Sequence, residues 1–230
     1  AQPESDIPAK QRAYSLKQGY VNHIIAKISH TEKKVYGKLI TSIEVAKNKT
    51  IEEIVFSKFQ PHYGKTVDEI VKDLSVNINM KAKSFYASLT KAILNIETDQ
   101  EIEEFEKADI TVKTVRLKVN NLPKEDISFP TFKYEELVNE DWDTSDFKSI
   151  LEHNFLFVFF QFNNDELVLR KVKFWNMPFK DIEEAKKVWD KTIEVIKQGN
   201  IVREIKEDKN GKEIRFSNFP NKDFNSVSHV

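Results

Sequence analysis

The chain has 230 residues, of which 40% are hydrophobic and 32% are charged, a composition typical of globular proteins and not of disordered or membrane proteins. Its 36 Lys and Arg residues nearly balance its 37 Asp and Glu residues, so the formal net charge of −1 excludes a globally basic nucleic-acid binder but not a local basic face. The absence of cysteine excludes disulfides, a thiol nucleophile and cysteine-ligated metals, and the five glycines do not form a dinucleotide or P-loop phosphate motif.

Residues 1–14 are polar and contain proline, which predicts a linker or arm, and residues 15–230 are expected to form the folded domain. The chain starts at Ala1 without methionine and stops at Val230 without an obvious structural close, so we expect a fragment of a longer protein. The longest apolar run, residues 155–160, is too short to cross a bilayer and follows no signal peptide. We therefore expect a cytoplasmic protein without a membrane partner.

Helical patterns dominate the first half of the chain. The first predicted helix has apolar residues at four-residue spacing, namely Leu16, Tyr20, Ile24 and Ile28. Two capping boxes, Thr50-x-x-Glu53 and Thr66-x-x-Glu69, predict helix starts, with a turn at residues 61–64 between them. A further helix is expected directly after Lys83.

Strand patterns follow in the second half. Residues 110–119 alternate and are rich in β-branched side chains, whereas residues 155–162 are almost wholly apolar, as in a strand buried on both faces. A turn at residues 163–165 predicts a hairpin with residues 167–175. A long helix is expected from its N-cap at Asp181 to residue 198, with Gly199 as its stop, and Asn210-Gly211 predicts another hairpin turn. The sequence thus predicts an α/β domain with a mixed β-sheet flanked by helices.

The usual catalytic motifs are missing from this sequence. The five histidines show no metal-binding spacing such as H-E-x-x-H, and no G-x-S-x-G elbow is present for a serine nucleophile. His23 lies on the first predicted helix beside apolar residues, so a structural role is favoured over a ligand role.

The segment EIEEFEKADITVKTVRL at residues 101–117 resembles MutH, the GATC-specific nicking endonuclease of mismatch repair. The resemblance is closer still to MutH-like type II restriction endonucleases that cut GATC. Matches continue in the same order over most of the chain, at GKTVDEI (residues 64–70), KSFY (83–86), PKEDISFP (123–130), FLFV (155–158) and KFWNMP (173–178). The resemblance implies a restriction-endonuclease-like fold of the MutH type.

The family's catalytic motif is an acid, six intervening residues and then E-x-K on a strand. Residues i and i+2 of a strand share one face, so the Glu and Lys meet the same phosphate while the carboxylates hold Mg²⁺. By resemblance the first acid falls at Glu104, the second at Thr111, the lysine at Lys113, and a further family carboxylate at Lys91. Because a threonine and a lysine replace two carboxylates, we expect a degenerate site that binds no metal itself, with Mg²⁺ serving the full-length enzyme.

One alternative keeps the nuclease active, with a neighbouring carboxylate shifted into the site. The candidates for that rescue are Glu103, Glu106 and Asp109.

The resemblance implies better-kept DNA-binding parts. Lys83 falls at a DNA-contacting lysine before a helix, and Phe129 at an aromatic residue that approaches the bases. Residues 107–133 hold six basic and three acidic residues, whereas residues 134–147 hold six acidic residues and no basic one. Such separated charge suits a DNA-binding face backed by an acidic one. The predicted DNA-binding residues are Lys83, Lys113, Lys118, Lys124, Phe129, Lys171 and Lys173.

The leading hypothesis is a catalytically degenerate, GATC-binding half of a bacterial type II restriction endonuclease. It would bind a second GATC site in double-stranded DNA and act as allosteric effector of a separate catalytic domain in the same polypeptide. The chain stops at His229-Val230, just before an arginine of the family's base-recognising arm, so this arm is expected to be incomplete. The alternatives are an active Mg²⁺-dependent GATC endonuclease domain and a purely structural partner domain.

Overall fold

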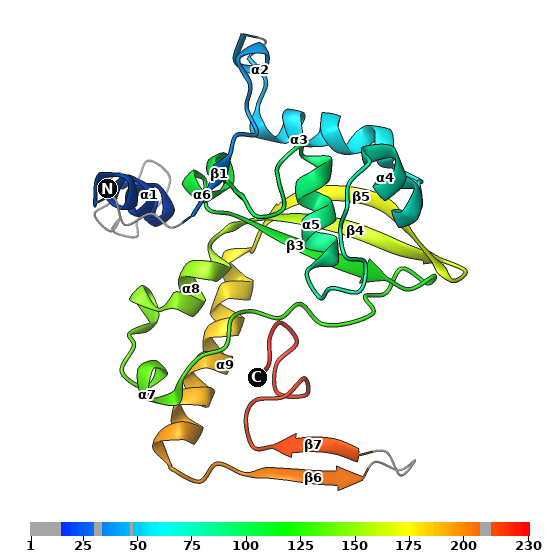
Figure 1. The fold of residues 1–230 in the computed structure, drawn as a ribbon. Coiled ribbons are helices and arrows are strands. Elements are labelled where there is room, and N and C mark those ends of the chain that lie inside the picture. Colours follow the sequence, from blue (N-terminus) through cyan, green and yellow to red (C-terminus); the bar gives the residue numbers. More distant parts are fainter. Residues whose placement is uncertain (1–14, 30–33, 47, 208–212) are drawn as a thin grey trace, which may run out of the picture. The chain divides into compact units, whose positions relative to one another are not determined.

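The computed structural model describes residues 15–29, 34–46, 48–207 and 213–230 (Figure 1). The predicted arm at residues 1–14 and the Asn210-Gly211 turn lie outside the described residues. The chain divides into two compact units, Ala1–Ile110 and Thr111–Val230. Helices and strands occur in both units, and helices flank the sheets, so the predicted α/β class is confirmed.

The first unit is mostly helical in its described part. Its elements are α1 (Gln18–Ser29), β1 (Tyr36–Gly37), α2 (Ser42–Ala46), α3 (Ile51–Phe59), η1 (Gln60–His62), α4 (Val67–Leu74), α5 (Phe85–Ile93), β2 (Glu101–Ile102) and α6 (Glu103–Lys107). Strands β1 and β2 pair in parallel, with Tyr36 opposite Glu101. Apolar side chains of α4 and α5 are buried, including Ile70, Phe85 and Leu89.

Both predicted capping boxes are confirmed. The Thr50 hydroxyl accepts the backbone N–H of Glu53, and the Glu53 carboxylate accepts the N–H of Thr50 at 2.8 Å. The same reciprocal pair starts α4 at Thr66 and Glu69. Each box satisfies two N–H groups that the helix itself leaves without an acceptor.

The apolar residues at four-residue spacing do not mark the buried face of α1. Leu16 and Ile28 are 67% and 73% exposed, whereas His23 is buried with its ring edge-on to Tyr36 at 5.3 Å. The reason is a close backbone approach, since a Cβ atom at Gly19 would lie only 2.7 Å from the carbonyl oxygen of Glu106 in α6. Gly19 and His23 lie one turn apart, so the face that carries them packs inward. The structural role predicted for His23 agrees with this position.

The second unit contains the main sheet. Its described elements are β3 (Ile110–Leu117, which starts one residue before the unit), α7 (Tyr134–Leu137), η2 (Trp142–Thr144), α8 (Asp146–Leu151), β4 (Asn154–Asn163), β5 (Glu166–Asn176), α9 (Phe179–Lys197), β6 (Arg203–Glu207) and β7 (Glu213–Ser217). The strand order is β3-β4-β5, and β6 and β7 form a separate antiparallel pair.

Strands β4 and β5 form the predicted antiparallel hairpin. The pairing runs from Asn154 opposite Asn176 to Asn163 opposite Glu166, and Asn164 adopts a positive φ of 54° in the turn. The register shifts between Phe159, opposite Lys171, and Phe160, opposite Leu169. Arg170 is therefore an extra residue in β5, which is a β-bulge.

Helix α9 begins earlier than predicted. Its N-cap is Pro178 and its first residue is Phe179, so the prediction of Asp181 as N-cap is wrong. Pro178 lacks an N–H and holds φ at −61°, which suits a helix start, and Asp181 lies in the first turn, where a carboxylate interacts favourably with the helix dipole. The predicted stop is confirmed, because Gly199 adopts a φ of +69°.

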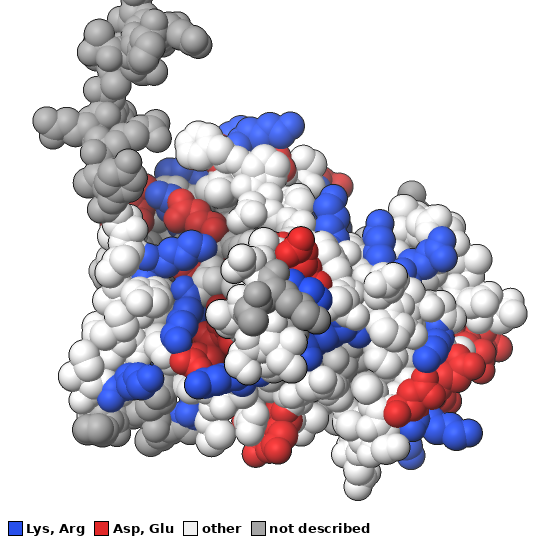
Figure 2. Space-filling view, turned by 90° about the horizontal axis from the view of Figure 1, so that it is seen from above, with Lys and Arg blue, Asp and Glu red and all other residues white. Residues whose placement is uncertain are grey.

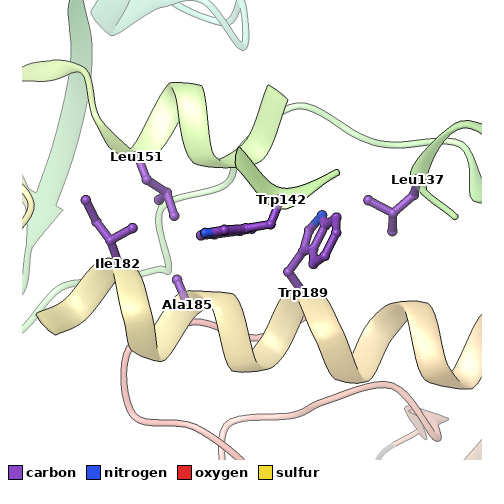
Figure 3. Packing of buried hydrophobic residues seen from close by; sticks show 6 residues of the cluster. All are labelled: Leu137, Trp142, Leu151, Ile182, Ala185 and Trp189. Atoms are coloured by element: carbon purple, nitrogen blue, oxygen red, sulfur yellow. The ribbon is translucent and has the colours of Figure 1, made fainter. Parts of the chain in front are cut away.

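A hydrophobic cluster joins α9 to the segment before β4 (Figure 3). It consists of Leu137, Trp142, Leu151, Ile182, Ala185 and Trp189, all of them buried. The two indole rings lie 5.4 Å apart between their centroids. No helix in the described part of the chain is long and apolar enough to cross a membrane.

Candidate nucleic-acid interface

Glu104, at the position of the family's first acid, is held by backbone groups within the first unit. Its two carboxylate oxygens accept the N–H groups of Leu39 and Ile40, both at 2.9 Å. A carboxylate that accepts two such charge-assisted bonds fixes the chain that follows β1 against α6. Its lone pairs are correspondingly less available to a cation.

The other charged residues near this position also have partners in the first unit. Lys91, on α5, forms an ion pair with Glu101 at 3.1 Å. Glu103 pairs with Lys107 at 2.6 Å, a hydrogen bond that holds the pKa of the Glu103 carboxyl below its usual value. Glu106 is 2.7 Å from Lys34. These contacts are structural ion pairs, and none of them gathers carboxylates at one point.

Lys83 and Asp109 complete the predicted residues of this unit. Lys83 is exposed in the turn before α5, where its ammonium faces solvent. Asp109 has a positive φ of 50°, and its carboxylate lies against Gly19, where a Cβ atom would be only 2.0 Å from Oδ1. Asp109 thus faces α1.

Thr111, at the position of the family's second acid, contacts a histidine in the second unit. Its hydroxyl is 2.8 Å from Nδ1 of His153, the residue just before β4, and either atom can donate in this bond. Both side chains are half-buried. A neutral hydroxyl engaged in this way supplies no negative charge to a metal.

Lys113, the lysine that the resemblance assigns to the catalytic motif, is half-buried beneath the segment that follows β3. Its ammonium donates to the backbone carbonyl of Ser128 at 2.8 Å and lies 4.7 Å from the centroid of the Phe129 ring. Burial lowers the pKa of the Lys113 ammonium. The lysine is therefore bound within the protein fold.

Phe129 is turned toward the interior of the unit. Its ring packs edge-to-face on Phe147 at 6.1 Å and on Phe155 at 6.3 Å, and it lies against the hydrophobic cluster of Figure 3. The sequence predicts Phe129 as an aromatic residue near DNA bases, and the structure places it as a half-buried packing residue.

These contacts define one face of the sheet, which we call the Lys113 face. Thr111 and Lys113 are two apart on β3 and share a face, and the Phe129 ring connects Lys113 to Phe155 on β4. On the hairpin, Phe155, Phe157 and Trp175 are in mutual ring contact at 5.7–6.0 Å. The face therefore carries an aromatic ladder beside the half-buried lysine.

The part of the Lys113 face formed by β5 is basic. Lys171 and Lys173 are exposed, as predicted, opposite Phe159 and Phe157 respectively. The Lys171 ammonium lies 5.5 Å from the centroid of the Phe159 ring. The bulge adds the exposed Arg170 to the Lys113 face, next to Lys171. Strict alternation along the strand would assign Arg170 to the opposite face.

The segment after β3 contributes two further cations. Lys118 and Lys124 are both exposed, and the Lys124 ammonium lies 4.8 Å from the ring of Phe162. Arg116 instead forms a bidentate ion pair with Glu125. Arg116–Glu125 and Lys133–Glu136 are ion pairs within this part of the chain, so the charge separation seen along the sequence is partly cancelled. On the face of the molecule in Figure 2, basic and acidic side chains also lie next to each other.

A metal centre is not formed by the side chains described in the structure. Among residues 15–29, 34–46, 48–207 and 213–230, no three His, Asp or Glu side chains gather closely enough to hold a metal ion. Thr111 offers a neutral hydroxyl and Lys91 an ammonium where the resemblance implies carboxylates, and neither group suits Mg²⁺, which binds carboxylate oxygens and water.

The chain is similar to the type II restriction enzyme Sau3AI of Staphylococcus aureus. The two sequences are 38% identical over an alignment of 247 residues that covers 100% of this chain and 50% of the enzyme. The chain thus spans about half the length of this relative. No protein-family model matches the sequence.

Proposed function

We propose that this chain is a double-stranded DNA-binding domain of a type II restriction endonuclease, of the MutH-like kind and with a restriction-endonuclease-like fold. It recognises GATC, does not cut DNA itself, and acts as allosteric effector of a separate catalytic domain in the same polypeptide. Its setting is the bacterial cytoplasm, where that DNA is found.

The observation that carries the proposal is the similarity to a restriction enzyme along the entire chain, with the match confined to half of that enzyme. The other half of such an enzyme is about as long as this chain. It is therefore long enough to form a catalytic domain in addition to an effector domain. GATC as the recognised sequence rests on the resemblance to the MutH family.

The basic part of the Lys113 face supports DNA as the ligand. Arg170, Lys171 and Lys173 are exposed and lie close together on β5, where the charge density of a phosphate backbone would attract them. Lys118 and Lys124 add two cations on the segment after β3. Such contacts position a protein on DNA, whereas sequence recognition requires contacts with base edges.

The residues at the family's catalytic positions support a non-cutting role. A nuclease of this family needs carboxylates around Mg²⁺, and here Glu104 is bound to two backbone N–H groups while Thr111 is bound to His153. We propose that Mg²⁺ serves the catalytic domain of the complete enzyme and that this domain binds none.

The direct test is a titration of the protein against a GATC duplex and a scrambled duplex of equal length, at fixed salt and with Mg²⁺. The bound DNA is then run on a denaturing gel. We expect tighter binding to GATC with both strands intact. Metal-dependent cleavage would establish the active-nuclease alternative, and absence of salt-sensitive binding to either duplex would establish the purely structural one.

A further inference from the structure

The lysine at the family's catalytic position contacts a loop of its own chain. Its ammonium donates to the carbonyl of Ser128 at 2.8 Å, and the ring of Phe129 lies 4.7 Å away. In the described part of the chain, burial alone lowers its pKa, with no carboxylate contributing. A half-buried ammonium without a carboxylate partner depends on such carbonyl and ring contacts for compensation.

The contacted segment, residues 118–129, is also held at other places, among them Glu125, whose carboxylate forms a bidentate ion pair with Arg116 of β3. At its base, the N–H of Lys118 donates to the carbonyl of Leu122, and the N–H of Lys124 donates to the carbonyl of Arg116, each at 2.8 Å. In its middle, Asp126 pairs with Lys222 at 2.7 Å. Without Lys113, residues 127–129 would keep the packing of the Phe129 ring but lose their polar attachment to the sheet.

The same segment carries exposed groups suited to a DNA duplex. Lys124 is exposed, and Ile127 is 40% exposed although it is a large apolar side chain. Lys124 is fixed to β3 by its own N–H and by the ion pair between the neighbouring Glu125 and Arg116, whereas Ile127 lies beyond these contacts. Next to Ile127, the Ser128 carbonyl is tied to β3 through the Lys113 ammonium.

We propose that Lys113 is a positioning residue that fixes residues 127–129 for DNA recognition, and that its ammonium does not contact DNA phosphate. This inference rests on the proposed function for its DNA part, whereas the attachment itself is a property of the protein without DNA. Lys113 thus occupies the strand position that the resemblance assigns to a catalytic lysine, but it binds residues 128 and 129 of its own chain and not a scissile phosphate.

The test compares the unaltered protein with Lys113→Met and Lys113→Arg. Methionine preserves an unbranched apolar chain but has no donor, whereas arginine can still donate to the Ser128 carbonyl and lie on the Phe129 ring. The first measurement is the NMR order parameter of the backbone amides without DNA. We expect Lys113→Met to lower this parameter at residues 127–129 from about 0.85 to below about 0.6, with β4 and β5 unchanged and Lys113→Arg close to the unaltered protein.

The second measurement is the affinity for GATC and scrambled duplexes over a range of salt concentrations. We expect Lys113→Met to lower the preference for GATC while the slope of log affinity against log salt stays the same, with arginine restoring the preference. A slope lowered by about 0.9 would instead mean that Lys113 neutralises a phosphate, and this result would overturn the proposal.

The two measurements also separate this proposal from the proposed function. Unchanged order parameters at residues 127–129 in Lys113→Met would refute the attachment whatever the DNA results. If the unaltered protein bound no DNA, the proposed function would fail, while the order parameters would still decide whether Lys113 holds the segment.

Discussion

At the scale of single residues, the partners of a side chain decide what it can do, and sequence position alone does not. Glu104 aligns with a catalytic acid by resemblance. Its two oxygens, however, accept the N–H groups of Leu39 and Ile40, which precede it by 65 and 64 positions in the chain. Nothing in the local sequence around Glu104 indicates these long-range bonds. The sequence could therefore identify the residue but not its use as a structural acceptor.

A change of Glu104 to glutamine should accordingly destabilise the protein. The glutamine NH₂ group cannot accept a hydrogen bond, so it would face the N–H of Leu39 or Ile40 and leave that group without an acceptor. We expect a loss of about 2 kcal/mol in the free energy of unfolding, measured by urea denaturation. Glu52→Gln, at an exposed position in the first turn of α3, is the matched control, with an expected effect within about 0.5 kcal/mol. Equal stability of the two variants would contradict the structural role of Glu104.

Restoring the family's second acid should not restore cleavage. Thr111→Glu adds one carboxylate, but Glu104 stays bound to backbone N–H groups, and Lys91 still places a positive charge where the resemblance implies a carboxylate. We expect no Mg²⁺-dependent cutting of a GATC duplex above the level of Thr111→Val, which removes the hydroxyl at nearly constant volume. GATC cleavage by Thr111→Glu would show that a metal site can assemble from the remaining carboxylates.

At the scale of secondary-structure elements, features fixed by neighbours in sequence were predictable. The capping boxes of α3 and α4 and the β4–β5 hairpin each depend on residues a few positions apart, and the structure contains all of them. The face of α1 was not predictable, because it is set by the approach of Gly19 to the α6 backbone, some 90 residues away. The bulge at Arg170 was likewise hidden, since alternation along a strand gives no sign of an inserted residue.

The bulge leads to a prediction about strand β5 as a DNA-binding element. If Arg170, Lys171 and Lys173 each neutralise a phosphate, changing all three to alanine should lower the slope of log affinity against log salt by roughly 3. The loss should be similar for GATC and scrambled duplexes, because phosphate contacts carry no sequence information.

The matched control removes the same charge from the exposed residues Lys180, Lys187 and Lys197 of α9. Binding measured by fluorescence anisotropy across salt concentrations should then keep its slope. A slope changed equally by both triple variants would mean that overall charge, and not the Lys113 face, governs binding.

At the scale of the whole molecule, the division into two units limits what the sequence can say about a site. Glu104 belongs to the first unit, whereas Thr111 and Lys113 belong to the second, and the boundary falls between Ile110 and Thr111. The resemblance gives the spacing of these three residues along the chain. A spacing along the chain determines which side chains meet in space only when the intervening residues are held rigidly. The contacts of each position, which the sequence did not predict, carry the proposed loss of catalysis.

The half-length match to a restriction enzyme leads to a prediction for the complete enzyme. If this domain is an effector, DNA bound to it should stabilise the active state of the catalytic domain, and coupling of this kind is typically worth about 5- to 150-fold. A plasmid with two GATC sites should then be cut faster per site than a plasmid with one. Alanine at Arg170, Lys171 and Lys173 should remove this advantage and leave the rate on the one-site plasmid unchanged, because these residues lie outside the catalytic domain. Equal loss of rate on both plasmids would mean that the domain simply delivers DNA to the catalytic domain, without allosteric coupling.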